Sequence, residues 1–154
     1  MQHAINSRKR KLDLFFQRAQ SNNIDEETQS DLARYGAVLV CGYVERCVEV
    51  IILERLSNLA HPRVRKFIQA HFKRGTNYDC EAICQLLERF DPDWSQKFRA
   101  FLESHDEVVA AITSAYALRN SIAHGGDANR GLSGVIEIFN SAQIAVEKLV
   151  ECTR

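Results

Sequence analysis

The stretch from Glu26 to Leu59 constrains the fold most, because it contains no proline and repeats apolar residues at helical spacing throughout. Asp25, Glu26 and Glu27 supply the capping and first-turn acids that favour a helix start. Two apolar stripes run along different sides of the predicted helix, which must therefore be covered on most of its circumference, as the central rod of a bundle or one side of a dimer. One stripe is Ala33, Ala37, Val40, Cys41, Val44, Val48, Ile51 and Ile52, and the other is Leu32, Leu39, Tyr43, Val50, Leu53 and Leu56.

Helical spacing of apolar residues continues in the rest of the chain, which has only 7 glycines and 2 prolines. His61-Pro62 ends the long helix, because proline tolerates the first turn of a helix far better than its interior. We predict further helices at about residues 5–21, 62–72, 83–90, 94–102, 105–124 and 132–151, with a loop at 73–79. No strand pair or repeat is evident, so the sequence predicts an all-α fold, a bundle of four to five main helices plus short helical segments.

A chain of 154 residues fits one domain, with a basic N-terminal helix at 1–22 and a bundle core at 26–152. Apolar residues make up 45% and charged residues 26%, the balance of a soluble globular protein. Lysine and arginine equal aspartate and glutamate at 20 each, so no whole-molecule positive field attracts nucleic acid. Any contact with RNA must therefore be local.

Neither a secretory signal nor a membrane span is predicted. The basic run at residues 8–11 is not followed by an apolar stretch of secretory length, and nowhere do about eighteen uncharged apolar residues follow one another. We therefore expect a cytoplasmic protein without membrane contact.

The five cysteines are an odd number and do not resemble a disulfide framework, so we expect most of them to be small buried hydrophobic residues. Cys80 and Cys84 lie one turn apart downstream of His71, but this is not the spacing of a structural zinc site. We predict neither a metal site nor a cofactor.

The segment 115–126 concentrates residues that could do chemistry. Arg119 lies seven residues after Ile112 and four after Ala115, which predicts a guanidinium on the inward stripe of the helix. Tyr116, Asn120 and His124 follow one another at intervals of four residues and so share a neighbouring stripe. The helix ends at Gly125-Gly126, so we expect an imidazole, a guanidinium and an orienting amide to be adjacent at an open mouth.

Such a set suits attack of a ribose 2′-hydroxyl on the neighbouring 3′-phosphate. A histidine can remove or donate a proton near neutral pH, and an arginine can stabilise the charge that builds on the phosphoryl oxygens. The reaction needs no metal, and it is confined to RNA because DNA lacks the 2′-hydroxyl.

Arg119, four intervening residues that begin with Asn120, then His124 and a glycine resemble the signature of the HEPN superfamily. The wider pattern is similar to the RiboL-PSP-HEPN branch over residues 35–45 and 62–67, and the resemblance covers roughly residues 32–150. It implies a helical bundle that pairs into a homodimer and brings two arginine–histidine motifs into one cleft. It also implies a metal-independent endoribonuclease in which Arg119 and His124 are the catalytic pair and Asn120 supports them.

Relatives in this superfamily include toxins and phage-defence proteins. Some are held in check by a partner such as an antitoxin, and others have lost catalysis and only bind. A toxin, defence or RNA-stress role is therefore implied, and the alternative is a non-catalytic module that binds RNA or a nucleotide or serves as a regulatory subunit.

Structural roles compete with functional ones at each candidate residue. Arg119 could pair with a glutamate inside the bundle, and His124 could interact with the helix dipole. Glu45 could support either of them, although a solvated or dimer-interface ion pair is the ordinary explanation for such a residue. Tyr116 could contact a base but has the spacing of a core aromatic. A basic cluster could grip an RNA backbone or simply be solvated, and its members are Arg63, Arg65, Lys66, Lys73 and Arg74.

Overall fold

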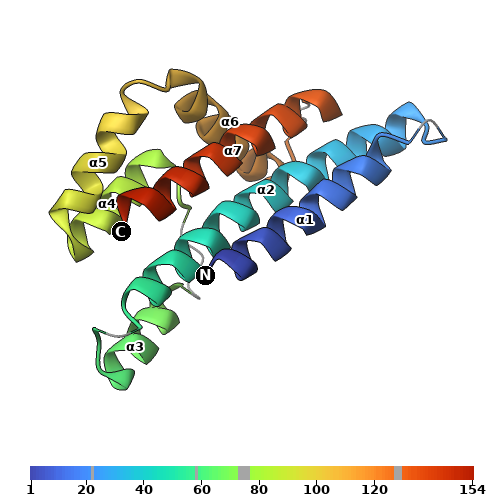
Figure 1. The fold of residues 1–154 in the computed structure, drawn as a ribbon. Helices are drawn as coiled ribbons and strands as arrows, with labels where there is room; N and C mark the ends of the chain where they lie inside the picture. The colour runs from blue at the N-terminus through green and yellow to red at the C-terminus, as the bar shows by residue number, and fades with distance from the viewer. Residues whose placement is uncertain (22, 58, 73–76, 127–129) are drawn as a thin grey trace.

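The computed structural model describes residues 1–21, 23–57, 59–72, 77–126 and 130–154, and over these residues it contains seven helices and no strand (Figure 1). The all-α prediction is confirmed. The number of helices is slightly above the four to five main ones predicted, because each of the short segments forms a helix of 11 residues. The helices are α1 (Gln2–Ala19), α2 (Glu26–Arg55), α3 (Pro62–Phe72), α4 (Cys80–Phe90), α5 (Pro92–Leu102), α6 (Asp106–Ala123) and α7 (Leu132–Cys152).

Aspartate caps set the starts of three helices. The Asp25 carboxylate accepts a hydrogen bond from the Thr28 backbone N–H at 2.9 Å, and Asp79 and Asp91 cap α4 and α5 in the same way. Pro92 occupies the first turn of α5, where its missing N–H costs nothing. Both helices begin earlier than the predicted residues 83 and 94, because the cap carboxylate rather than the apolar pattern fixes the first turn.

The long helix α2 is the centre of the bundle and packs against α1, α6 and α7 (Figure 1). Its C-terminal end is tied to α7 by Arg55, whose Nη2 donates to the Val150 carbonyl at 3.0 Å and whose Nε donates to Thr153 Oγ1 at 3.2 Å. The N-terminal helix α1 belongs to the same core. Its buried residues are Ile5, Leu12, Phe16 and Ala19, and they pack with α2 and α7.

Two parts lie outside this central layer. The α4–α5 hairpin packs against α7, while α3 extends beyond the C-terminal end of α2, against which it packs (Figure 1). Phe72 is the one buried residue of α3. All five cysteines are buried, as expected. Within the described part of the chain, no helix has both the length and the apolar character that a membrane crossing needs.

Candidate functional site

The C-terminus of α6 is closed by a Schellman motif built on two glycines. Gly125 has a φ of 73°, and its N–H donates to the Ile122 carbonyl at 3.1 Å. The Gly126 N–H donates to the Ser121 carbonyl at 2.8 Å. The backbone requires a glycine at position 125, whose φ is positive, whereas a Cβ on Gly126 would collide with the Ser121 hydroxyl. The predicted helix end at Gly125-Gly126 is therefore confirmed.

His124 is the C-cap residue of α6 and projects into solvent. Its backbone N–H is shared between the carbonyls of Asn120 at 3.1 Å and Ser121 at 3.2 Å, which fixes the position of its Cα. The imidazole is exposed and makes no hydrogen bond or ion pair with any described residue. Asn120, one turn earlier, is exposed as well. The histidine is thus presented by a rigid backbone with its ring available to a ligand.

Arg119 lies at the edge of the contact between α6 and α2. Its Nη2 is 3.8 Å from Oε1 of Glu45 on α2, and its Nη1 donates a hydrogen bond to Oδ1 of Asn77. The side chain is 30% exposed. The inward stripe of Ile112 and Ala115 does continue to Arg119, but α6 leaves the core at this point, so the guanidinium is half-buried rather than enclosed.

Burial dominates the electrostatics next to the arginine. Partial burial raises the pKa of Glu45 although Arg119 and Arg46 both favour its charged form, and no described residue donates a hydrogen bond to its buried Oε1. Burial also raises the pKa of Tyr116, beside Cys41 and Glu45, so its hydroxyl stays protonated. Tyr116 is 4% exposed, which is the core position that its spacing favoured, and in the single chain it cannot stack on a base.

A single chain does not place Arg119 beside His124. His124 follows Arg119 by five positions, which turns their side chains about 140° apart around the helix axis and about 7.5 Å apart along it. The guanidinium is directed to α2 and Asn77, whereas the imidazole faces solvent. No described hydrogen bond or ion pair joins the two groups within one chain, so their pairing at a mouth stays a prediction.

Two residues that the sequence did not single out complete the surroundings of the motif. Asn77 holds the Arg119 guanidinium from the segment before α4, and Arg34 of α2 donates from its Nη2 to the Gly126 carbonyl at 3.1 Å. Neither residue stands in a recognisable pattern. Both residues are recognised only from their contacts with α6 and the turn that follows it.

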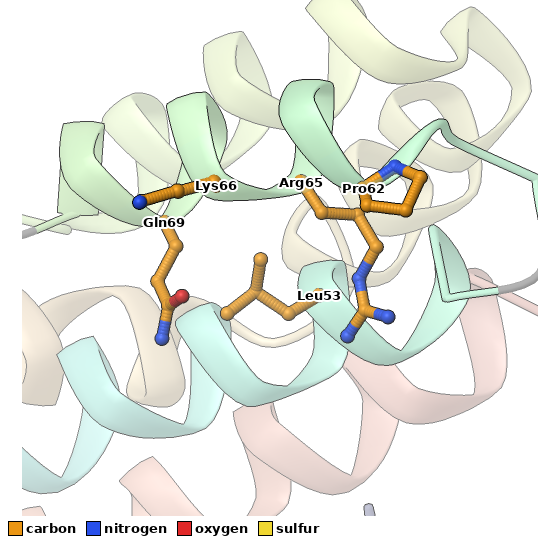
Figure 2. Close-up of a pocket in the computed structure, with 5 residues that line it drawn as sticks. All are labelled: Leu53, Pro62, Arg65, Lys66 and Gln69. Carbon is orange, nitrogen blue, oxygen red and sulfur yellow. The ribbon is translucent and has the colours of Figure 1, made fainter.

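The predicted basic cluster lies away from this motif. Arg65 and Lys66 line a hollow of about 360 Å³ between α2 and α3, together with Leu53, Pro62 and Gln69 (Figure 2). Arg63 is exposed on α3. Lys73 and Arg74 lie outside the described residues. Among the residues that are described, no three His, Cys, Asp or Glu side chains come together in an arrangement that could hold a metal ion.

The family comparison gives a match over nearly the whole chain: the RiboL-PSP-HEPN family model covers residues 3–153. The chain belongs to the RiboL-PSP-HEPN family. Neither a curated protein nor a solved structure matches it. In this RiboL-PSP-HEPN domain Arg119 lies on α6, and His124 is the C-cap residue of that helix.

The α6 motif of the RiboL-PSP-HEPN domain combines a fixed cation with an exposed proton-transfer group. The Arg119 guanidinium presents several N–H donors, of which one on Nη1 bonds to Asn77, while Nη2 lies 3.8 Å from Glu45. The remainder can bind an anion such as a phosphate. The His124 imidazole can exchange a proton with that anion once the imidazole and the Arg119 guanidinium reach the same ligand.

Proposed function

We propose that this RiboL-PSP-HEPN domain is a metal-independent endoribonuclease. The observation that carries the proposal is the construction of α6, which ends in a Schellman motif that holds His124 at its exposed cap, five residues after an arginine anchored on α2. A solvent-facing imidazole on a rigid backbone suits proton transfer, and a half-buried guanidinium suits an anionic transition state.

In the proposed reaction the ribose 2′-oxygen attacks the adjacent phosphorus in line with the leaving 5′-oxygen. The 2′-hydroxyl gives up its proton to a base, and the 5′-oxygen receives a proton as its bond to phosphorus breaks. His124 acts as general acid or base, Arg119 neutralises the phosphoryl oxygens, and Asn120 orients the substrate or the imidazole. The products end in a 2′,3′-cyclic phosphate and a 5′-hydroxyl.

A second copy of the chain is part of the proposal. Because Arg119 and His124 diverge by about 140° around one helix, a twofold-related α6 is the simplest way to bring the arginine of one chain to the histidine of the other. In such a homodimer one cleft would hold two motifs. This arrangement agrees with what family resemblance implies.

The exposed face of α2 is the surface that we propose for the dimer contact. Tyr35 is 56% exposed and Val38 is 36% exposed, and nothing lies within 4 Å of the place where a Cβ of Gly42 would be. Together with Glu45 these residues share one side of α2, next to the Arg119 motif. An apolar strip with a glycine lets another helix approach closely. Sedimentation analysis tests the contact, and Gly42→Arg is expected to convert the dimer to a folded monomer.

Cleavage of end-labelled RNA in the presence of a chelator tests the chemistry. The parent protein is expected to release fragments with 2′,3′-cyclic phosphate ends, and a single 2′-deoxy substitution at the cut site should block that cut. His124→Ala is expected to lower the rate at least about a hundredfold, the usual contribution of a general acid or base. His3→Ala, which removes an exposed histidine on α1, serves as the matched control. Undiminished cleavage by folded His124→Ala protein would refute the assignment.

A non-catalytic binding module is the second candidate, and one observation favours it. In a single chain Arg119 already pairs with Glu45 and does not contact His124, which equally suits a structural arginine. A module of this kind would bind RNA or a nucleotide without cleaving it. Thermal shifts with nucleotides, combined with intact RNA after incubation, would identify this function.

A cytoplasmic toxin, phage-defence or RNA-stress role, with an antitoxin or another regulatory protein as partner, follows from the proposed activity. Growth arrest on expression that His124→Ala relieves is the expected sign. Arrest that persists with the variant would separate toxicity from the proposed chemistry.

A further inference from the structure

The exposed side of α3 combines apolar and cationic residues outside the α6 motif. Phe67 is 77% exposed and Val64 is 48% exposed, and Leu59, just before the helix, is 81% exposed. Single exposed apolar residues are common on protein surfaces, but here three of them are close in sequence around one short helix. Three exposed apolar side chains around one short helix indicate a binding surface.

The charge of α3 identifies the kind of partner. Over Pro62–Phe72 the helix carries Arg63, Arg65 and Lys66 and no acidic residue, although the whole chain is neutral. A second copy of α3 would bring the same positive charges against this face. A polyanion with aromatic groups complements both features at once, because its phosphates meet the cations and its bases meet the exposed phenylalanine.

We infer that the exposed side of α3 binds single-stranded RNA, with Phe67 stacked on a base and Arg63 and Lys66 on the neighbouring phosphates. The choice of RNA as the polymer rests on the proposed nuclease function. The residues of α3 indicate that this RNA is single-stranded and where it binds. A base inside a duplex cannot offer its face to Phe67, and sequence-tolerant stacking on an exposed aromatic is a property of single-strand sites.

Helix geometry separates the two kinds of contact. Arg63, Phe67 and His71 follow one another at intervals of four residues and share the outer side of α3. Arg65 and Gln69 extend toward α2 and border the hollow of about 360 Å³, with Leu53 on its opposite wall (Figure 2). Lys66 also borders the hollow, on the side nearer Arg63. The backbone of the strand therefore passes Lys66 and Arg63 at the edge of the hollow, where a base can turn to Phe67.

The α3 surface is also connected to the proposed catalytic motif along α2. Glu45 contacts Arg119, and Leu53, eight residues later, lines the hollow, so the two places are about 12 Å apart along the helix axis. A strand of a few nucleotides spans this distance. RNA held on α3 can thus extend to Arg119 without bending back.

Fluorescence anisotropy of a short labelled RNA tests this inference, with His124→Ala as the background so that the strand stays intact. Phe67→Ala is expected to weaken binding about tenfold, and Phe67→Trp to retain it, whereas Ile144→Ala, at an exposed apolar position on α7, should change nothing. Arg63→Gln with Lys66→Gln should lower the slope of log K against log salt by about 1.4. The matched control is Arg89→Gln with Lys97→Gln, two exposed cations on α4 and α5.

Three results would overturn the inference: equal affinity for a fully paired duplex, unchanged RNA binding by Phe67→Ala, or a change in oligomeric mass instead of RNA affinity. Each is distinguishable from failure of the nuclease proposal. If the parent cuts RNA but the α3 variants bind it normally, only this inference fails. If the α3 variants lose binding but His124→Ala cuts at the parent rate, only the catalytic assignment fails.

Discussion

Arg34 of α2 donates a hydrogen bond to the carbonyl oxygen of Gly126, so the turn that follows His124 is attached to the central helix of the bundle. The two residues are 92 positions apart in the sequence. The Schellman motif fixes the shape of the helix end, and this bond fixes its place relative to α2. The position of the exposed imidazole therefore depends on a hydrogen bond in which the imidazole itself takes no part.

Replacement of Arg34 by methionine is the first prediction. The apolar stem is kept, but the hydrogen bond to the Gly126 carbonyl is lost, which should cost about 1 kcal/mol of unfolding free energy for a half-buried charged donor. RNA cleavage should fall further than this loss explains, about tenfold under conditions where the protein stays folded, because misplacement of a catalytic group lowers the rate steeply. Urea unfolding and cleavage are measured on the same sample. A rate equal to that of the parent would show that the attachment does not position His124.

The second prediction concerns the close approach of Gly126 to Ser121. Gly126→Ala should destabilise the protein by about 1–2 kcal/mol, because the new methyl group overlaps the Ser121 hydroxyl. Ser121→Ala in the same chain removes that hydroxyl and should recover part of the loss, although the Ser121 carbonyl still lies 3.2 Å from the added carbon. A double-mutant cycle in urea measures the coupling. Strictly additive effects of the two substitutions on the unfolding free energy would contradict the close contact between Gly126 and the Ser121 hydroxyl.

The sequence predicted this helix end well and its surroundings poorly, for a physical reason. The glycine pair after His124 requires a local backbone conformation, and local conformation can be inferred from neighbouring residues. The contacts of Arg34 and Asn77 join residues 92 and 42 positions away from their partners. No local pattern encodes such a pairing, so both residues were missed.

The same limit applies to Arg119. Periodicity correctly assigned it to the stripe of Ile112 and Ala115, but periodicity does not say where the neighbouring helix stops covering that stripe. The arginine therefore lies half-exposed beside Glu45 instead of in the core. The adjacency of Arg119 and His124 at the helix end was also predicted from the sequence, but the described contacts of the guanidinium are with Glu45 and Asn77.

The third prediction follows from the raised pKa of Glu45. An acid whose pKa is higher in the folded than in the unfolded protein binds more protons when the protein is folded. The stability that Glu45 contributes is therefore present at a pH below its unfolded-state pKa and is lost as the pH rises through its higher folded-state pKa. Glu45→Gln removes this dependence. The variant should match the parent near pH 4 and be more stable by up to about 1 kcal/mol at pH 7, because Arg119 stays partly solvated.

Thermal unfolding of both proteins across this pH range is the measurement. Glu49→Gln is the control, since Glu49 lies one turn along the same helix and pairs with Arg46 at 2.7 Å. A larger stability advantage of Glu45→Gln at low pH than at neutral pH would contradict the sign argued here. Cleavage by Glu45→Gln should show a changed dependence of rate on pH if the carboxylate positions Arg119.

The fourth prediction is complementation between two inactive variants. If the working pair is the arginine of one chain and the histidine of its partner, an Arg119→Ala chain and a His124→Ala chain each lack one member of every pair. Mixed dimers of the two contain one intact pair. With random exchange of subunits half of the dimers are mixed, so the mixture should recover about a quarter of the parent activity.

The variants are mixed under conditions that allow subunit exchange, and RNA cleavage is compared with that of each variant alone. The double variant Arg119→Ala/His124→Ala mixed with parent chains is the control, because its mixed dimers contain no intact pair if pairing occurs between chains. They retain one if pairing occurs within a chain. Recovery in the first mixture with loss in the second therefore assigns the pair to two chains. The opposite pattern would mean that one α6 alone brings guanidinium and imidazole to the same phosphate, despite the angle of about 140° between them.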